Sequence, residues 1–257
     1  MSIYAYQLLK GLGLSEQRAL RVLPSIKVES LDANQIICRK GAKPEAWTHI
    51  VSGLVSAGIP DKNGAITPIN IFGPGTWFGE VAILNRQALM VECICLTPVR
   101  ILTMPLAQAV EAFEHEAEFS RHVARLVAWR TQQNAEMLTL MRLGSPQLRV
   151  VMGLALFAEA LHNSSSHLPT SDLDDCQEIP LKQSLLASMC GVSRGIFSEC
   201  VQQLANAGWI RLNYATLALP RVRMWHKFSS NHRNNRHNNN KPSMQEILSL
   251  MAEASVS

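Results

Sequence analysis

The stretch from Ile179 to Asn206, IPLKQSLLASMCGVSRGIFSECVQQLAN, restricts the fold of this chain more than any other part of the sequence. Apolar residues recur at helical spacing in both of its halves, which predicts two helices that each have one apolar face. Between them, Gly191 allows a tight turn without steric penalty. Ser193 is a natural N-cap for the second helix, because its hydroxyl can accept a bond from an otherwise unpaired N–H. The stretch is therefore either a DNA-binding helix-turn-helix or an ordinary helical hairpin.

The charge distribution around this stretch favours DNA binding. Between positions 179 and 241 the sequence has nine Lys and Arg residues and one acid, Glu199, which gives this segment a formal charge of +8. The whole chain carries only +4. A basic surface of this kind supplies the phosphate contacts that a DNA-binding domain requires. A solvated basic surface without a partner is the alternative.

The first half of the chain has a different pattern. From Val28 to Met104, short apolar runs alternate with turn residues, which predicts a small antiparallel β-barrel or roll. Asn63-Gly64 favours a hairpin turn, since both residues tolerate positive φ. A short amphipathic helix is expected before this region, near residues 15–23. With 257 residues, the chain is long enough for two domains with separate cores.

The motif GPGTWFGE, at residues 73–80, and the helix-turn-helix with Ser193-Arg194 resemble those of the Crp/Fnr family of transcription regulators. The resemblance runs in order from about residue 25 to residue 220. It implies an α+β chain: an antiparallel β jelly roll of the cyclic-nucleotide-binding type, a long dimerisation helix, and a C-terminal winged helix-turn-helix. The expected domains are 1–105, 106–143 and 144–228, in that order. Further positions of the resemblance are Arg39, Gly41, Ala46, Val51 and Gly53.

The FGE motif predicts a ligand site beside the short helix that follows it. Gly79 permits close approach of the backbone to an anion, and Glu80 can accept bonds from sugar hydroxyls. In cyclic-nucleotide-binding members of the family, an Arg-Ser or Arg-Thr pair stands where this chain has Leu89 and Met90. The expected effector pocket consists of Phe78, Gly79, Glu80, Val81, Ala82, Leu89 and Met90.

Without that arginine, burial of a phosphate is costly, because a buried anion needs a cation. The sequence therefore predicts poor cAMP binding and control by a different small ligand. The alternative is a cyclic-nucleotide-responsive regulator in which Arg86 replaces the usual phosphate-binding arginine from a shifted loop. A structural role for Glu80, as a turn residue or as the partner of a core cation, is as well supported as a ligand role.

No cofactor or metal is predicted, and the sequence does not identify the effector. Residues 1–37 contain no cysteine for an iron–sulfur sensor, and Cys93 and Cys95 lack zinc-site spacing. His49, His115 and His122 are haem-ligand candidates by residue type only. Ser, His and Asp residues are scattered without a catalytic motif, so an enzyme is not expected.

The segment from Leu106 to Leu143 contains no Gly or Pro and predicts one long helix. Its apolar seam has Arg130 and Gln133 in the middle, a pattern typical of a two-stranded coiled coil with a polar centre. A helix packed on its own domain is the alternative. In the family this helix forms the dimer interface, and a symmetric dimer matches a palindromic DNA site. The seam residues are Phe119, Val123, Leu126, Met137 and Leu140.

Gly144-Ser145-Pro146 ends this helix and begins the next one. Within the helix-turn-helix, the resemblance assigns base contacts to Arg194, Gly195 and Glu199. Arg194 suits a bidentate contact with guanine, whereas many relatives have Glu where Gly195 stands. The full set of expected DNA contacts is Lys182, Gln183, Ser193, Arg194, Gly195, Ser198 and Glu199.

Residues 208–212 and 216–219 predict a two-stranded wing. The Asn- and His-rich composition after Phe228 predicts a basic, disordered tail over residues 229–257, in which residues 243–254 can form one helix. Neither a signal peptide nor a membrane span is recognisable. The sequence thus predicts a cytoplasmic homodimer on double-stranded DNA, with RNA polymerase as a partner if it activates transcription. A ligand-binding or protein-interaction module without specific DNA binding is the alternative.

Overall fold

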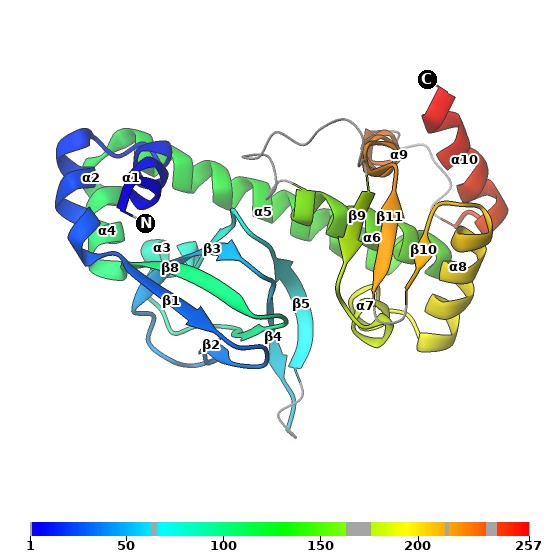
Figure 1. Ribbon diagram of the computed structural model, residues 1–257, viewed down its shortest axis with the longest axis horizontal. Coiled ribbons are helices and arrows are strands. Elements are labelled where there is room, and N and C mark those ends of the chain that lie inside the picture. Colours follow the sequence, from blue (N-terminus) through cyan, green and yellow to red (C-terminus); the bar gives the residue numbers. More distant parts are fainter. Residues whose placement is uncertain (1, 63–65, 163–175, 214–215, 235–240, 257) are drawn as a thin grey trace. The chain divides into compact units, whose positions relative to one another are not determined.

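The structure is a computed structural model that describes residues 2–62, 66–162, 176–213, 216–234 and 241–256 (Figure 1). The chain separates into two compact units, Met1–Asn134 and Ala135–Ser257, and each unit is described by itself. In the described ranges, no helix has the length and apolar character needed to cross a membrane.

The first unit is built on two four-stranded antiparallel sheets, which confirms the predicted β-roll. In the predicted hairpin, the paired strands place Pro60 opposite Ile66, while Asn63 and Gly64 lie outside the described residues. One sheet has the order β1 (Lys27–Leu31), β8 (Val99–Pro105), β3 (Ala46–Ser52), β6 (Trp77–Phe78). The other has the order β2 (Ile36–Cys38), β7 (Glu92–Cys95), β4 (Val55–Pro60), β5 (Ile66–Phe72).

An aromatic cluster joins this roll to the helices around it. The Trp47 ring stacks on Trp77 at 4.3 Å between centroids and meets the edge of Phe119 at 5.5 Å. Helix α2 (Glu16–Val22) was expected, and its N-cap Ser15 accepts a bond from the Arg18 N–H at 3.4 Å. Helix α1 (Ser2–Gly11) was not expected; its buried Ala5 and Leu9 belong to the same core. The short 3-10 helix η1 (Leu23–Ser25) leads into β1.

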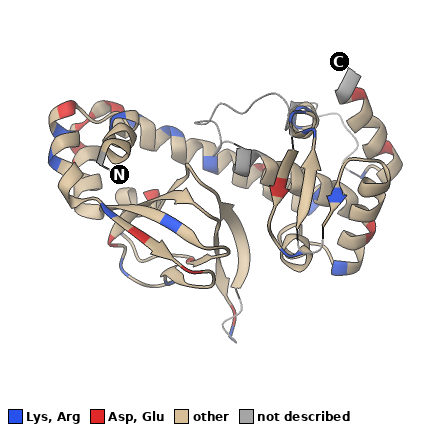
Figure 2. Ribbon diagram, in the orientation of Figure 1, with Lys and Arg blue, Asp and Glu red and all other residues tan. Residues whose placement is uncertain are grey.

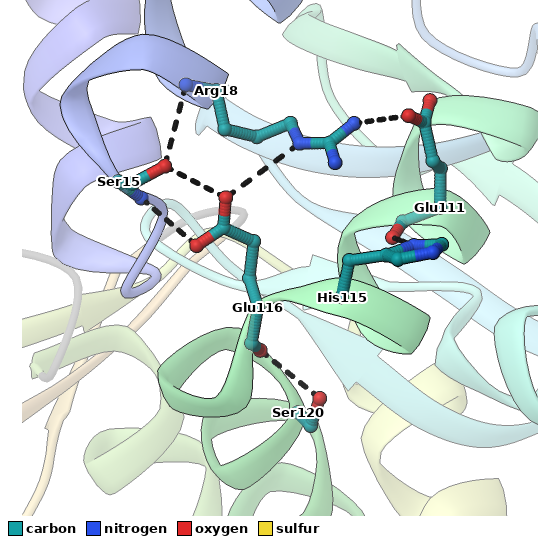
Figure 3. A network of polar contacts seen from close by, with 6 residues as sticks. All are labelled: Ser15, Arg18, Glu111, His115, Glu116 and Ser120. Atoms are coloured by element: carbon teal, nitrogen blue, oxygen red, sulfur yellow. Dashed lines mark hydrogen bonds and ion pairs between the residues drawn. The ribbon is translucent and has the colours of Figure 1, made fainter.

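The single helix expected over residues 106–143 is wrong, because the structure has two helices there. Helix α4 (Leu106–His115) ends at Glu116, whose backbone is extended (φ −113°, ψ 101°), and α5 (Ala117–Leu143) follows. Figure 3 shows the cause: the Glu116 carboxylate accepts bonds from the Ser15 hydroxyl at 2.7 Å and the Ser15 N–H at 3.4 Å. The Arg18 guanidinium pairs with both Glu111 and Glu116. These tertiary contacts override a uniformly helical composition.

The seam predicted for a coiled coil faces the first unit's own core in its N-terminal part. Phe119 and Val123 are fully buried there, and Leu126 packs against the same cluster. The alternative, a helix packed on its own domain, is therefore correct for these residues. Arg130, expected as a polar seam residue, turns to Glu80 of the roll and forms an ion pair with it.

The second unit contains the predicted winged helix-turn-helix. Helix α6 (Pro146–His162) begins where predicted, since the Ser145 hydroxyl accepts the Leu148 N–H at 3.2 Å and Pro146 occupies the first turn. The two helices of the motif are α7 (Gln183–Met189) and α8 (Arg194–Asn206). The wing pairs β10 (Arg211–Leu212) with β11 (Leu217–Pro220), and β11 also pairs with an unpredicted strand, β9 (Cys176–Ile179).

The disorder expected over residues 229–257 is wrong for residues 229–234 and 241–256, whereas the helix expected over residues 243–254 is confirmed. Helix α9 (Val222–Asn234) buries Trp225 and Phe228 at helical spacing and packs against α6. Helix α10 (Met244–Val256) buries Ile247 and Met251 against the other helices of the unit. It begins with a capping box, in which Ser243 and Glu246 bond each other's backbone N–H groups. Apolar burial thus orders a segment whose average composition is polar.

Candidate functional site

The β-roll encloses a cavity of about 980 Å³ between its sheets and helices α3 (Glu80–Asn85) and α5. All seven residues of the expected effector pocket lie in its lining. Phe78, Glu80 and Ala82 are buried there, whereas Val81 and Met90 are exposed to solvent at 50% and 73%. Aliphatic side chains and Phe72 supply much of the remaining wall. The cavity has the size and the largely apolar lining of a small-molecule site.

The FGE motif forms part of the wall of this cavity. Gly79 is the N-cap of α3 with φ +96°, a backbone conformation that residues with a Cβ rarely adopt. Glu80, the first residue of the helix, points its carboxylate at the guanidinium of Arg130, and the two form an ion pair with little exposure. The same guanidinium donates to the backbone carbonyl of Trp77 and lies 5.0 Å from the centroid of the Phe72 ring.

These contacts give Glu80 one of the two roles expected from the sequence, that of the partner of a core cation. The carboxylate is compensated by Arg130, so a ligand that bonds to either group must compete with the pair. Arg130 is a cavity residue that the sequence did not predict. Its only signal was a cation at a seam position of a long helix.

The region that would hold a phosphate lacks the usual arginine. Leu89 and Met90 line the cavity, and Leu89 exchanges backbone hydrogen bonds with Gly41 and Ala42 at 2.8 and 3.0 Å. Arg86 does not lie in the cavity lining; it pairs with Glu114 at 2.7 Å on an exposed surface. Its left-handed backbone (φ 52°) ends α3. This position disfavours Arg86 as the replacement phosphate ligand.

The histidines considered as haem ligands have separate surroundings. His49 is buried beside Trp77 and lies 3.2 Å from the Tyr4 hydroxyl. His115 bonds to the Glu111 carbonyl at 2.9 Å (Figure 3). Within the described ranges, no group of three His, Cys, Asp or Glu residues is arranged to hold a metal ion.

The helix-turn-helix presents a polar surface at the start of α8. The Ser193 hydroxyl accepts the Ile196 N–H at 3.3 Å, which confirms the predicted N-cap. Phe197, Val201 and Leu204 are buried on the inner face of the helix, and Gly191 turns with φ +62°. Every residue of the expected DNA-contact set is exposed: Lys182, Gln183, Ser193, Arg194, Gly195, Ser198 and Glu199.

Glu199 is oriented by a neighbour on its own helix. Its carboxylate accepts a bond from the Gln203 side chain at 3.3 Å, one turn further along. No ion pair between Glu199 and Arg194 is found in the described part of the chain, so the Arg194 guanidinium is not held by an acid one turn away. Figure 2 shows basic positions at the start of α8 and on β10.

Some cations of the basic segment serve the fold. The Arg221 guanidinium lies 4.4 Å from the centroid of the Trp209 ring and donates to the Gly208 carbonyl at 3.0 Å. Arg233 pairs with Glu136 at 3.6 Å. The formal charge of this segment therefore overstates the number of cations that are free for phosphate contacts.

Residues 28–116 match the family described as the cyclic nucleotide-binding domain. No curated protein matches the sequence. Among solved structures, FixK2 from Bradyrhizobium japonicum is 14% identical with a TM-score of 0.62, covering 78% of this chain and 96% of that one. TTHA1359 from Thermus thermophilus, described as a transcriptional regulator of the CRP/FNR family, is 19% identical with a TM-score of 0.57, covering 79% and 98%.

A third similar structure is CLP from Xanthomonas campestris, described as a c-di-GMP responsive global regulator. It is 15% identical with a TM-score of 0.59, and the match covers 80% of this chain and 99% of that chain. At these identities the likeness establishes the fold. The predicted resemblance is thereby confirmed: the chain has the fold of Crp/Fnr-type regulators and contains a domain of the cyclic nucleotide-binding type.

Proposed function

We propose that this protein is a sequence-specific, DNA-binding transcription regulator that acts as a homodimer and is controlled by a small ligand other than cAMP. The observation that carries the proposal is the polar N-terminal end of α8, where Arg194 and Ser198 are exposed while Phe197 anchors the helix to the core. A helix of this kind enters the major groove with its first residues toward the bases. Such a regulator works in the cytoplasm, where RNA polymerase is a further partner if it activates transcription.

Electrophoretic mobility shift or fluorescence anisotropy with genomic promoter fragments tests this proposal. The wild-type chain is expected to select particular fragments, and Arg194→Ala is expected to lose that selectivity, because one bidentate base contact is worth about 1–3 kcal/mol. Arg100→Ala is the matched control: it removes the same charge from an exposed position on β8 of the first unit. Its binding should be unchanged.

Two outcomes would contradict the docking arrangement. Equal operator affinity for Arg194→Ala and the wild type would exclude α8 as the base-reading element. Failure of the folded wild-type chain to bind any promoter fragment, at low as well as high salt, would favour the alternative of a ligand-binding or protein-interaction module. Non-specific DNA binding alone would appear as a strong dependence on salt without selection among fragments.

The dimer is supported by an exposed stripe on α5. Ala124 and Ala128 are four residues apart and both exposed, on the side of the helix opposite Phe119. Small side chains allow two copies of the helix to approach closely. This face replaces the N-terminal part of the predicted seam, where Phe119, Val123 and Leu126 pack in the chain's own core.

The ligand proposal rests on the cavity's charge arrangement. Arg130, the least exposed cation of its lining, is already paired with Glu80, and the place of the usual phosphate partner is taken by Leu89 and Met90. We expect no micromolar cAMP affinity by isothermal titration calorimetry. Cyclic di-GMP is the second probe, because CLP is described as responsive to it. Micromolar cAMP affinity would overturn the exclusion of cAMP, while leaving the DNA-binding proposal in place.

A further inference from the structure

Two cysteines of the first unit face each other across paired strands. Cys38 of β2 and Cys93 of β7 are partners in the antiparallel register, at a bulge in β2. Partner Cα atoms in antiparallel strands are about 4.5–5.5 Å apart, within the span of about 4.4–6.8 Å that a disulfide requires. Both residues are free thiols, and both line the cavity. Their pairing in the register therefore brings the two thiols to neighbouring positions, as a disulfide requires.

The two thiols differ in reactivity because one acts as a donor to the other. Hydrogen bonds from the Cys93 thiol and from the Cys93 backbone N–H hold the pKa of Cys38 below its ordinary value, against the opposing effects of burial and of Glu92. The same contact and burial raise the pKa of Cys93. Cys38 is also partly exposed, whereas Cys93 is buried. This division matches an attacking thiolate with a resolving thiol beside it.

We propose that Cys38 and Cys93 form a peroxide-oxidisable dithiol that closes to an intramolecular disulfide in the cavity wall. The Cys38 thiolate attacks one oxygen of hydrogen peroxide, the O–O bond breaks, and the leaving hydroxide takes a proton to become water. Cys38 is then a sulfenic acid. The Cys93 sulfur, after losing its proton, attacks the Cys38 sulfur, and the S–O bond breaks to release a second water. Two thiols and one peroxide thus give one disulfide and two waters.

The disulfide would lie next to two backbone segments that line the cavity. Past the cysteine pair, the strand ends continue into residues 39–42 and 89–91, which the two backbone bonds of Leu89 with Gly41 and Ala42 hold together. A covalent link beside these bonds restricts their opening. The oxidised chain is therefore expected to show slower hydrogen exchange at the Leu89 amide than the reduced chain.

The reduced full-length chain, treated with hydrogen peroxide and mapped by mass spectrometry, tests the proposal without any substitution. It should lose two of its six thiols and yield one linked peptide pair containing Cys38 and Cys93. Before oxidation, Cys38 should react with iodoacetamide at least about tenfold faster than Cys95, since burial raises the pKa of Cys95. None of these readouts depends on DNA binding.

Variants separate the roles of the three neighbouring cysteines. Cys95→Ser is the matched control, because Cys95 is buried on the same strand and should be dispensable for the disulfide. Cys93→Ser should stop the reaction at a Cys38 sulfenic acid that dimedone traps, and Cys38→Ser should abolish it. A linkage only between subunits, equal oxidation of Cys38 and Cys95, or no reaction with peroxide in the native chain would overturn the proposal.

Discussion

The carboxylate of Glu80 and the guanidinium of Arg130 form an ion pair that joins α3 to α5. Both side chains are largely removed from water, and the guanidinium also bonds to the Trp77 carbonyl. Desolvation of two charges offsets much of their attraction, so the pair contributes less to the net stability than its geometry suggests. Removal of one partner is different, because it leaves the other charge buried and uncompensated.

Arg130→Met should therefore lower the free energy of unfolding of the first unit by about 3 kcal/mol. Chemical denaturation followed by tryptophan fluorescence reports this loss, since Trp47 and Trp77 lie in the same unit. The double variant Glu80→Gln with Arg130→Met should regain part of the stability, because no uncompensated charge remains. Equal stability of Arg130→Met and the wild type would show that the pair is open in solution.

The break between α4 and α5 gives a pH-dependent contribution to stability. The bond from the Ser15 hydroxyl, more than the bonds from its N–H and the nearby Arg18, holds the pKa of Glu116 below its usual 4.5. A depressed carboxylate pKa stabilises the folded state above pH 4.5, and this stabilisation is lost as the pH falls through the folded-state pKa. Glu116→Gln should cost roughly 1 kcal/mol at neutral pH and nothing in acid.

Chemical denaturation of Glu116→Gln and of the wild type between roughly pH 3 and pH 7, the range in which carboxylates titrate, would measure the difference in unfolding free energy. Glu118→Gln is the control, because Glu118 pairs with Arg121 on the exposed surface of the next helix turn. A pH-independent difference between Glu116→Gln and the wild type would attribute the loss to packing instead of charge.

The exposed stripe of α5 gives a direct test of the dimer. Ala128→Glu places two like charges, one from each subunit, in the proposed interface. It should therefore shift the chain toward monomer in sedimentation velocity. Trp129→Ala is the control: it lies about 100° further round the helix and is half exposed, so its loss should leave the dimer intact. Dissociation by Trp129→Ala but not by Ala128→Glu would move the interface to another face of α5.

The C-terminal helix is expected to be an integral part of the second unit. Ile247→Ala should lower the unfolding free energy by about 2–4 kcal/mol, because Ile247 is fully buried and its truncation leaves a cavity. Gln245→Ala, on the exposed side of the same helix, should have little effect. Thermal denaturation of the full chain would separate the two, and a negligible cost for Ile247→Ala would favour the tail that the composition predicted.

Local patterns predicted the structure wherever local interactions determine it. The apolar spacing, Gly191 turn and Ser193 cap define α7 and α8 within one stretch of chain, and the β-roll follows from its turns. The break at Glu116 was not predictable, because its partner Ser15 belongs to a helix at the other end of the unit's sequence. The helical spacing of Trp225 and Phe228 was present but obscured by the Asn-rich composition that follows it.

The residues of the candidate site likewise fall into those that local sequence predicted and those that tertiary packing brings together. The seven pocket residues come mostly from one contiguous motif and its loop, and they line one cavity. Arg130 lies on a helix whose register against the roll is set by tertiary packing, so its periodicity indicated a dimer seam instead. Cys38 and Cys93 are neighbours because β2 pairs with β7. The two strands are far apart in the sequence, so their pairing was not predictable from local patterns.

The Glu80–Arg130 pair also restricts which substitutions the sequence can accept during evolution. A relative that replaces the acid retains a buried cation without a counter-charge, and a relative that replaces the cation retains a buried acid. Either single change costs stability, whereas the paired change to apolar residues costs little. The two positions should therefore covary among true orthologues, and a lineage in which both are apolar would keep Gln133 as the one polar residue in the middle of the α5 seam.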